Sequence, residues 1–160
     1  MPSTLMSMPN RQPVLFAGLA ALVILGSAYG FQAAGYAPCD LCWLQRYPYM
    51  AIIPIAFIAH FIKAPVKPVL ILLGLLFLAD AGIAAYHVGV EQKWWQGPTE
   101  CTASGLLSDD PAEALKAIMN APLVRCDEIA WSLFGISMAG YNFIVALGLA
   151  LFSLIRSRKG

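Results

Sequence analysis

The stretch "VLILLGLLFLADAGIAAYHV", residues 69–88, decides the fold class because it is almost entirely apolar and contains a single acidic residue. A helix needs roughly 20 apolar residues to cross the hydrocarbon core of a bilayer. Further apolar stretches lie at about 14–31, 48–62 and 133–155, and that at 48–62 is marginal in length unless it takes in Tyr47 and its neighbours. The sequence therefore predicts an all-α integral membrane protein, a four-helix transmembrane bundle forming a single membrane domain over residues 1–160.

The composition supports this prediction. Of the 160 residues, 59% are hydrophobic and 12% are charged, whereas a soluble domain carries about 25% charged residues. A core of this size cannot bury so much apolar surface, so a bilayer is the natural solvent for it. The net charge of +1 suggests neither a nucleic acid nor another polyanion as partner.

The first apolar stretch has an alternative interpretation as a cleaved signal peptide. Arg11 would form its basic region, and Gly26 to Ala28, "GSA", its cleavage site. One basic residue is few for such a region, and the apolar run is long. These features favour a membrane span.

Four spans bring both termini to one side of the membrane. Two loops, at about 32–47 and 89–132, then lie on the other side, where they carry eight of the nine acidic residues and all four Trp residues. The positive-inside rule places the basic side in the cytoplasm and the two loops outside. The basic residues on the cytoplasmic side would be Arg11, Lys63, Lys67, Arg156, Arg158 and Lys159.

All four cysteines fall in these outer loops, where an oxidising compartment favours pairing. Four cysteines allow three connectivities. The simplest joins Cys39 to Cys42 and Cys101 to Cys126, and a cross-loop pair stays open. A zinc site would require a second close cysteine pair or clustered histidines; neither is present, so no metal site is predicted.

Cys39 and Cys42 have the spacing of a redox pair. A bridge across two residues closes almost no loop and contributes little to stability, whereas one thiol can attack and the other resolve. We expect a short helical turn ended by Pro48, which places Arg46 on the face of Cys42 at i+4. A guanidinium there favours the reactive thiolate; alternatively, Arg46 extends to lipid headgroups.

The Cys101–Cys126 pair is open to two interpretations. It is either a second redox pair or a structural disulfide, which in the chain-entropy model contributes about 3 kcal/mol. Asp110 followed by Pro111 is typical of a helix start. The second loop is therefore predicted to carry a short surface helix between the two cysteines.

Two polar residues of residues 69–88 are further candidates. His87, at the end of the stretch, is either an ordinary interfacial residue or, with Arg46, part of a site for a lipid-soluble electron acceptor with two carbonyl oxygens. Asp80 lies near mid-span, where a charge costs at least about 2.5–3.5 kcal/mol. It is either part of a proton route or a protonated group bonded to a neighbouring helix.

Three segments resemble the bacterial disulfide bond formation protein B (DsbB) family. They are the Cys-x-x-Cys-x-x-x-Arg motif of Cys39, Cys42 and Arg46, the run "YHVGVEQKWWQGPTEC" at 86–101, and "CDEIAWSLFGISMAGYN" at 126–142. The resemblance implies an inner-membrane oxidoreductase that reoxidises a periplasmic thioredoxin-fold oxidase of the DsbA type. It implies further that the electrons pass to a membrane quinone, ubiquinone or menaquinone.

The resemblance also implies a role for each residue. Cys101 would form the mixed disulfide with the partner, and Cys126 would pair with Cys101. Cys39 and Cys42 would pass the electrons on, with Cys42 facing the quinone and Arg46 and His87 binding its ring. Alternatives are a paralogous oxidase with a dedicated substrate, an enzyme of the vitamin K epoxide reductase type, whose cysteine order fits less well, and a non-catalytic scaffold with two structural disulfides.

Overall fold

The computed structural model describes residues 11–97 and 125–159. These residues form four helices, α1 (Gln12–Ala33), α2 (Asp40–Phe61), α3 (Val66–Glu91) and α5 (Met138–Lys159), with strands β1 (Ser132–Leu133) and β2 (Ile136–Ser137) directly before α5. Each helix is long and apolar enough to cross a membrane. The predicted four-helix membrane bundle is confirmed.

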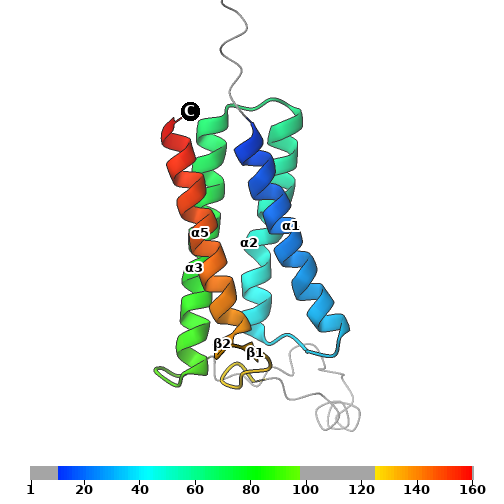
Figure 1. Ribbon diagram of the computed structural model, residues 1–160, viewed down its shortest axis with the longest axis vertical. Coiled ribbons are helices and arrows are strands. Elements are labelled where there is room, and N and C mark those ends of the chain that lie inside the picture. Colours follow the sequence, from blue (N-terminus) through cyan, green and yellow to red (C-terminus); the bar gives the residue numbers. More distant parts are fainter. Residues whose placement is uncertain (1–10, 98–124, 160) are drawn as a thin grey trace, which may run out of the picture.

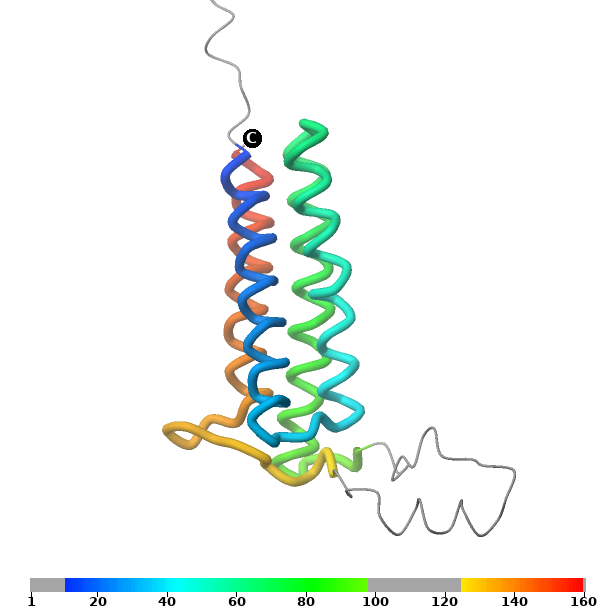
Figure 2. Tube along the Cα trace, turned by 90° about the vertical axis from the view of Figure 1, so that its right-hand side faces the viewer, coloured from blue at the N-terminus to red at the C-terminus, as the bar shows by residue number. Residues whose placement is uncertain are grey.

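The helices form two layers, with α1 and α5 in front of α2 and α3 (Figures 1 and 2). The most extensive packing is between α3 and α5, followed by α1 on α2 and α2 on α3, whereas α1 and α5 touch little. The start of α1 and the end of α5 lie at one end of the bundle (Figure 1). The opposite end, which carries the start of α2 and the β1–β2 hairpin, is called the cysteine end below.

Helix α2 differs from the prediction at its start. It begins at Asp40 rather than near residue 48, and it continues through Pro48 and Pro54. The prediction that Pro48 ends a short helical turn is therefore wrong. A proline inside a membrane helix is tolerated where neighbouring groups satisfy the freed backbone. The longer helix also removes the doubt about the length of the second span.

Helix α5 begins later than predicted because residues 132–137 form a two-stranded hairpin. Phe134 and Gly135, between the two strands, have positive φ angles of 51° and 79°. Two successive left-handed residues are typical of the turn that matches the twist of a tight hairpin. Helix α3 begins at Val66 and ends at Glu91, a little beyond the predicted bounds on both sides.

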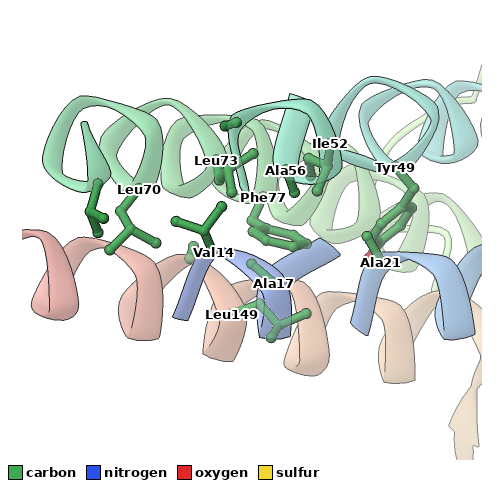
Figure 3. Packing of buried hydrophobic residues seen from close by; sticks show 13 residues of the cluster. Val14, Ala17, Ala21, Tyr49, Ile52, Ala56, Leu70, Leu73, Phe77 and Leu149 are labelled. Atoms are coloured by element: carbon green, nitrogen blue, oxygen red, sulfur yellow. The ribbon is translucent and has the colours of Figure 1, made fainter. Parts of the chain in front are cut away.

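The core runs along the bundle axis and combines small residues with larger apolar ones (Figure 3). Helices approach closely where a residue lacks a side chain: a Cβ added at Gly74 would lie 2.8 Å from Cγ of Leu154. Small residues at such crossings are typical of membrane helices. The labelled core residues are Val14, Ala17, Ala21, Tyr49, Ile52, Ala56, Leu70, Leu73, Phe77 and Leu149.

The outer surface of the bundle is apolar, as a lipid-facing surface requires. Large side chains such as Val23, Ile58, Leu75 and Ile155 are exposed on the four helices. The predicted surface helix of the second loop, with Asp110 and Pro111, lies outside the described residues.

Candidate redox site at the cysteine end

The Cys39–Cys42 pair lies at the start of α2. Cys39 is the N-cap residue, and its Sγ accepts a hydrogen bond from the backbone N–H of Cys42 at 3.3 Å. The two Sγ atoms are 2.8 Å apart and both cysteines are free. Because a disulfide bond is about 2.05 Å long, the pair needs only a small movement to close.

The two sulfurs differ in their environment. The hydrogen bond with Cys42, with burial as the next cause, raises the pKa of the Cys39 thiol above its usual range. This direction favours Cys39 as the protonated member of the pair and Sγ of Cys42 as the acceptor of its hydrogen bond. A negative charge on the reduced pair accordingly resides on Cys42.

A cavity of about 370 Å³ lies against this pair, between α1 and the start of α5. Its size falls within the range of small-molecule sites, which are mostly apolar with a few polar groups. Cys42, Arg46 and His87 contribute to its wall, as do residues of the hairpin region. The apolar lining residues include Ile24, Leu25, Phe31, Trp131, Leu133, Met138 and Val145.

Arg46 is buried and is held between α1 and α2. Its guanidinium lies 4.6 Å from the ring centroid of Tyr29 and 4.7 Å from that of Trp43. It donates hydrogen bonds to Oε1 of Gln32 at 2.6 Å and to the backbone oxygen of Ala28 at 3.2 Å. Arg46 thus lies on the helix of Cys42, one turn further on, rather than extending to the surface.

His87 contacts the first cysteine rather than the second. Its Nε2 lies 3.6 Å from Sγ of Cys39 and 3.9 Å from Oε1 of Glu91. Glu91 in turn accepts a short hydrogen bond from the hydroxyl of Ser137. His87 is 4% exposed, so it is a buried member of the site.

Cys126 also reaches the site. It packs against the cluster of Cys39, Leu41 and Val90, and its backbone interacts with the His87 ring. The second cysteine pair thus has one member beside the first. Cys101 lies outside the described residues.

A buried polar network extends from His87 toward the middle of the bundle, and the sequence did not predict it. Asn142 of α5 donates to Gln45 at 2.8 Å and to Asp80 at 2.9 Å, and accepts from the Tyr49 hydroxyl at 2.6 Å. Gln45 reaches Nδ1 of His87 at 2.7 Å. Asp80 bonds to a neighbouring helix, as one of its two interpretations expected, with Asn142 as its partner, and its protonation stays a prediction.

The structure also brings together a possible ligand set that sequence spacing did not reveal. Sγ of Cys39, Sγ of Cys42 and one ring nitrogen of His87 all lie within 4.8 Å of one another. Thiolates and imidazole are the ligands that Zn²⁺ prefers. His87 is distant from the cysteines in sequence, and only its position near the end of α3 hinted at this proximity.

Comparison with known proteins gives the family of the chain. The family model "Disulfide bond formation protein DsbB" matches residues 10–156. The chain belongs to the DsbB family. It is 32% identical to disulfide bond formation protein B 2 of Pseudomonas syringae, over 86% of this chain and 82% of the relative.

Other relatives agree with this assignment. Disulfide bond formation protein B of an Azoarcus species is 30% identical over 93% of this chain and 95% of its own. An uncharacterized protein of Rickettsia prowazekii is 29% identical over 73% of this chain and 69% of its own. No solved structure matches the chain. The DsbB-family chain is therefore a multi-pass membrane protein of disulfide bond formation, in which Cys39, Cys42 and Cys126 meet at one end of the bundle.

Proposed function

We propose that this protein reoxidises a soluble dithiol oxidase of the DsbA type and passes the electrons to a membrane quinone. The observation that carries the proposal is the position of the Cys39–Cys42 pair on the wall of an apolar cavity between α1 and α5. A thiol pair used only to stabilise a loop has no need of such a cavity. A quinone is an apolar ring with two polar oxygens, and it matches a cavity of this composition.

The electrons and protons balance in the proposed reaction. The partner's dithiol loses two electrons and two protons and becomes a disulfide. Cys101 accepts the partner's thiolate, exchange through Cys126 reduces the Cys39–Cys42 disulfide, and the reduced pair transfers two electrons and two protons to the quinone. The quinone becomes a quinol, and the Cys39–Cys42 disulfide forms again. A renewable acceptor is needed because the two protein disulfides alone support only one round.

Arg46 and Cys42 have distinct roles at the cavity. Cys42 is the sulfur that carries the charge of the reduced pair, and it is the one that attacks the quinone. Arg46 provides a fixed positive charge that stabilises the oxygen of the quinone as negative charge develops on it. Its burial between Tyr29 and Trp43 holds the guanidinium in place. His87 borders the cavity next to Cys39 and contributes to quinone binding.

The location of the protein follows from the same proposal. The cysteine end faces the periplasm, and both termini lie in the cytoplasm of a bacterium with the bundle in its inner membrane. The last turn of α5 carries Arg156, Arg158 and Lys159, which fits the cytoplasmic side. Trp94 and Trp95, directly after α3, fit the outer interface.

The absorbance of a short-chain quinone tests the proposal. Purified protein is mixed with the quinone and a reduced DsbA-type protein, and we expect catalytic loss of quinone. Cys42→Ser should abolish this loss while the partner is still captured at Cys101. Quinone reduction by Cys42→Ser at the unaltered rate would contradict the role of Cys42. Absence of turnover with several quinones, from folded protein, would instead favour a dedicated substrate or a scaffold.

A further inference from the structure

The hydrogen bonds around Gln45 determine which nitrogen of His87 carries the proton. The neutral imidazole has one N–H donor and one acceptor nitrogen, and its neighbours decide between them. One side-chain atom of Gln45 contacts both the backbone oxygen of Leu41, at 3.1 Å, and Nδ1 of His87, at 2.7 Å. A carbonyl oxygen only accepts, so this Gln45 atom has to be the amide nitrogen.

The assignment has a direct consequence for His87. The Gln45 amide nitrogen donates one hydrogen to Leu41 and the other to Nδ1, so Nδ1 is the acceptor nitrogen. The proton of the neutral ring therefore resides on Nε2. The groups near Nε2 can accept it: Sγ of Cys39 at 3.6 Å and Oε1 of Glu91 at 3.9 Å.

The rest of the network agrees with this direction. Gln45 Oε1, opposite the amide nitrogen, accepts from Nδ2 of Asn142. The same Nδ2 donates to Oδ2 of Asp80, and Oδ1 of Asn142 accepts from the Tyr49 hydroxyl. Every donor in the line from Tyr49 to His87 thus points toward the cysteines. Hydrogen bonds aligned in this way strengthen one another in a low-dielectric interior.

We propose that Gln45 is a positioning residue that holds His87 with its proton on Nε2, so that the imidazole donates to Cys39 and does not bind a metal ion. The role of His87 as a hydrogen-bond donor to Cys39 deepens the proposed function and rests on it. Sγ of Cys39 becomes a thiolate when a mixed disulfide at that sulfur is resolved, and an N–H donor stabilises this charge. The line of donors then continues from Cys39 to Cys42.

The second part of the proposal concerns the ligand set of Cys39, Cys42 and His87. A metal ion at Nε2 requires that nitrogen to be unprotonated, so the proton has to move to Nδ1. Histidines that bind metals donate this other N–H to a carboxylate, a carbonyl or water. At Nδ1 the Gln45 amide offers a donor instead, and the bond to Leu41 opposes its rotation. Gln45 thereby protects a redox pair whose geometry would otherwise suit a thiophilic metal.

Nuclear magnetic resonance on the unaltered protein tests the tautomer directly. The chain has two histidines, His60 and His87, and a His60→Gln variant assigns the signals. In ¹⁵N-histidine-labelled, fully reduced protein near neutral pH, we expect Nδ1 of His87 to be unprotonated and Nε2 to carry the proton. A proton on Nδ1 would overturn the proposal.

Zinc affinity tests the consequence for metal binding. Every variant carries Cys101→Ser and Cys126→Ser, so that Zn²⁺ cannot bind there, and competition with a chromophoric chelator measures the affinity of reduced protein. Gln45→Glu places an acceptor at Nδ1, and we expect Zn²⁺ to bind about 10- to 100-fold more tightly, the range that such outer partners control. Gln45→Glu also loses the hydrogen bond to Leu41. It loses this bond in the zinc-free and in the zinc-bound protein alike, so the loss does not change the zinc affinity.

A matched control separates this effect from added charge. Gln92→Glu adds the same carboxylate at the exposed end of α3, and it should leave the zinc affinity unchanged. Equal affinity in the parent and in Gln45→Glu would overturn the proposal. Equal gains in Gln45→Glu and Gln92→Glu would do the same. Neither measurement uses quinone or partner, so both results stand apart from the success or failure of the proposed reaction.

Discussion

Asn142 is the centre of the buried polar network, and its removal is the most informative perturbation of the bundle. It bonds to Tyr49 and Gln45 of α2 and to Asp80 of α3. Replacement by Leu keeps a side chain of similar size but leaves three polar groups without this partner. Asp80 is completely buried, and its Oδ1 has no hydrogen-bond partner among the described residues. The variant therefore removes the bond to Oδ2 of Asp80, and within that part of the chain the carboxyl group keeps only its interaction with the Tyr49 hydroxyl.

The magnitude follows from measurements on membrane helices in general. One interhelical hydrogen bond contributes about 0.6 kcal/mol on average and about 1.7 kcal/mol at most. Three such bonds contribute about 2 kcal/mol, and the buried carboxyl group of Asp80, which loses its Asn142 partner, adds to this. We therefore expect Asn142→Leu to lower the free energy of unfolding by about 2–4 kcal/mol, a large part of the stability of an ordinary domain.

Reversible unfolding in mixed micelles with increasing denaturing detergent measures this change. Ile144→Leu is the matched control, because Ile144 is on the same helix, is 55% exposed and belongs to the lipid-facing surface. A loss below about 0.5 kcal/mol for Asn142→Leu, within the usual scatter of surface substitutions, would refute the reasoning.

A double-mutant cycle locates the effect. Asp80→Leu removes the buried carboxyl group that Asn142 bonds. The double variant should therefore lose less free energy of unfolding than the sum of the two single variants. We expect a coupling free energy of about 0.6–1.7 kcal/mol, the range for one membrane hydrogen bond. Strict additivity would mean that the contact between Asp80 and Asn142 contributes nothing.

Three shorter predictions concern packing and the site. Gly74→Ala should destabilise the bundle by about 1–3 kcal/mol in the same unfolding assay, because the new Cβ would overlap α5. Gly82→Ala is the control: Gly82 is on the same helix with open space around it, and its replacement should leave the stability unchanged. Arg46→Lys should raise the KM for quinone about tenfold, since an ammonium lacks the planar shape that stacks between two rings; an unchanged KM would contradict the placement of Arg46. Alkylation of the reduced protein near pH 8, followed by mass spectrometry, should modify Cys42 before Cys39, whose pKa is raised; the reverse order would contradict the assignment of the charge.

The sequence predicts the membrane fold well because hydropathy over 20 residues is a strong signal. It predicts the ends of the helices less well, since local rules compete there. Pro48 was expected to end a turn, but the bundle tolerates it within α2. The hairpin at 132–137 lies in a stretch whose hydropathy is that of a span.

The site could be predicted only in part. The i+4 spacing placed Arg46 on the face of Cys42, since that relation lies within one helix. The contact between His87 and Cys39 depends on the rotation of α3 against α2, which hydropathy does not specify. The same holds for Gln45 and Asn142, which are far apart in sequence and meet because two helices turn these side chains inward.

The two sulfurs of the redox pair thus receive different support, and on the proposed function this difference sets the direction of electron flow. Cys39 packs against Cys126 and accepts from the line of donors that ends at His87. Both cysteines border the cavity, but Arg46 lies one turn further along the helix of Cys42. Thiol exchange therefore enters the pair on the side of Cys39, and the charge comes to rest on Cys42. An acceptor in the cavity then meets Cys42 already charged, and Cys39, which also borders the cavity, closes the disulfide again.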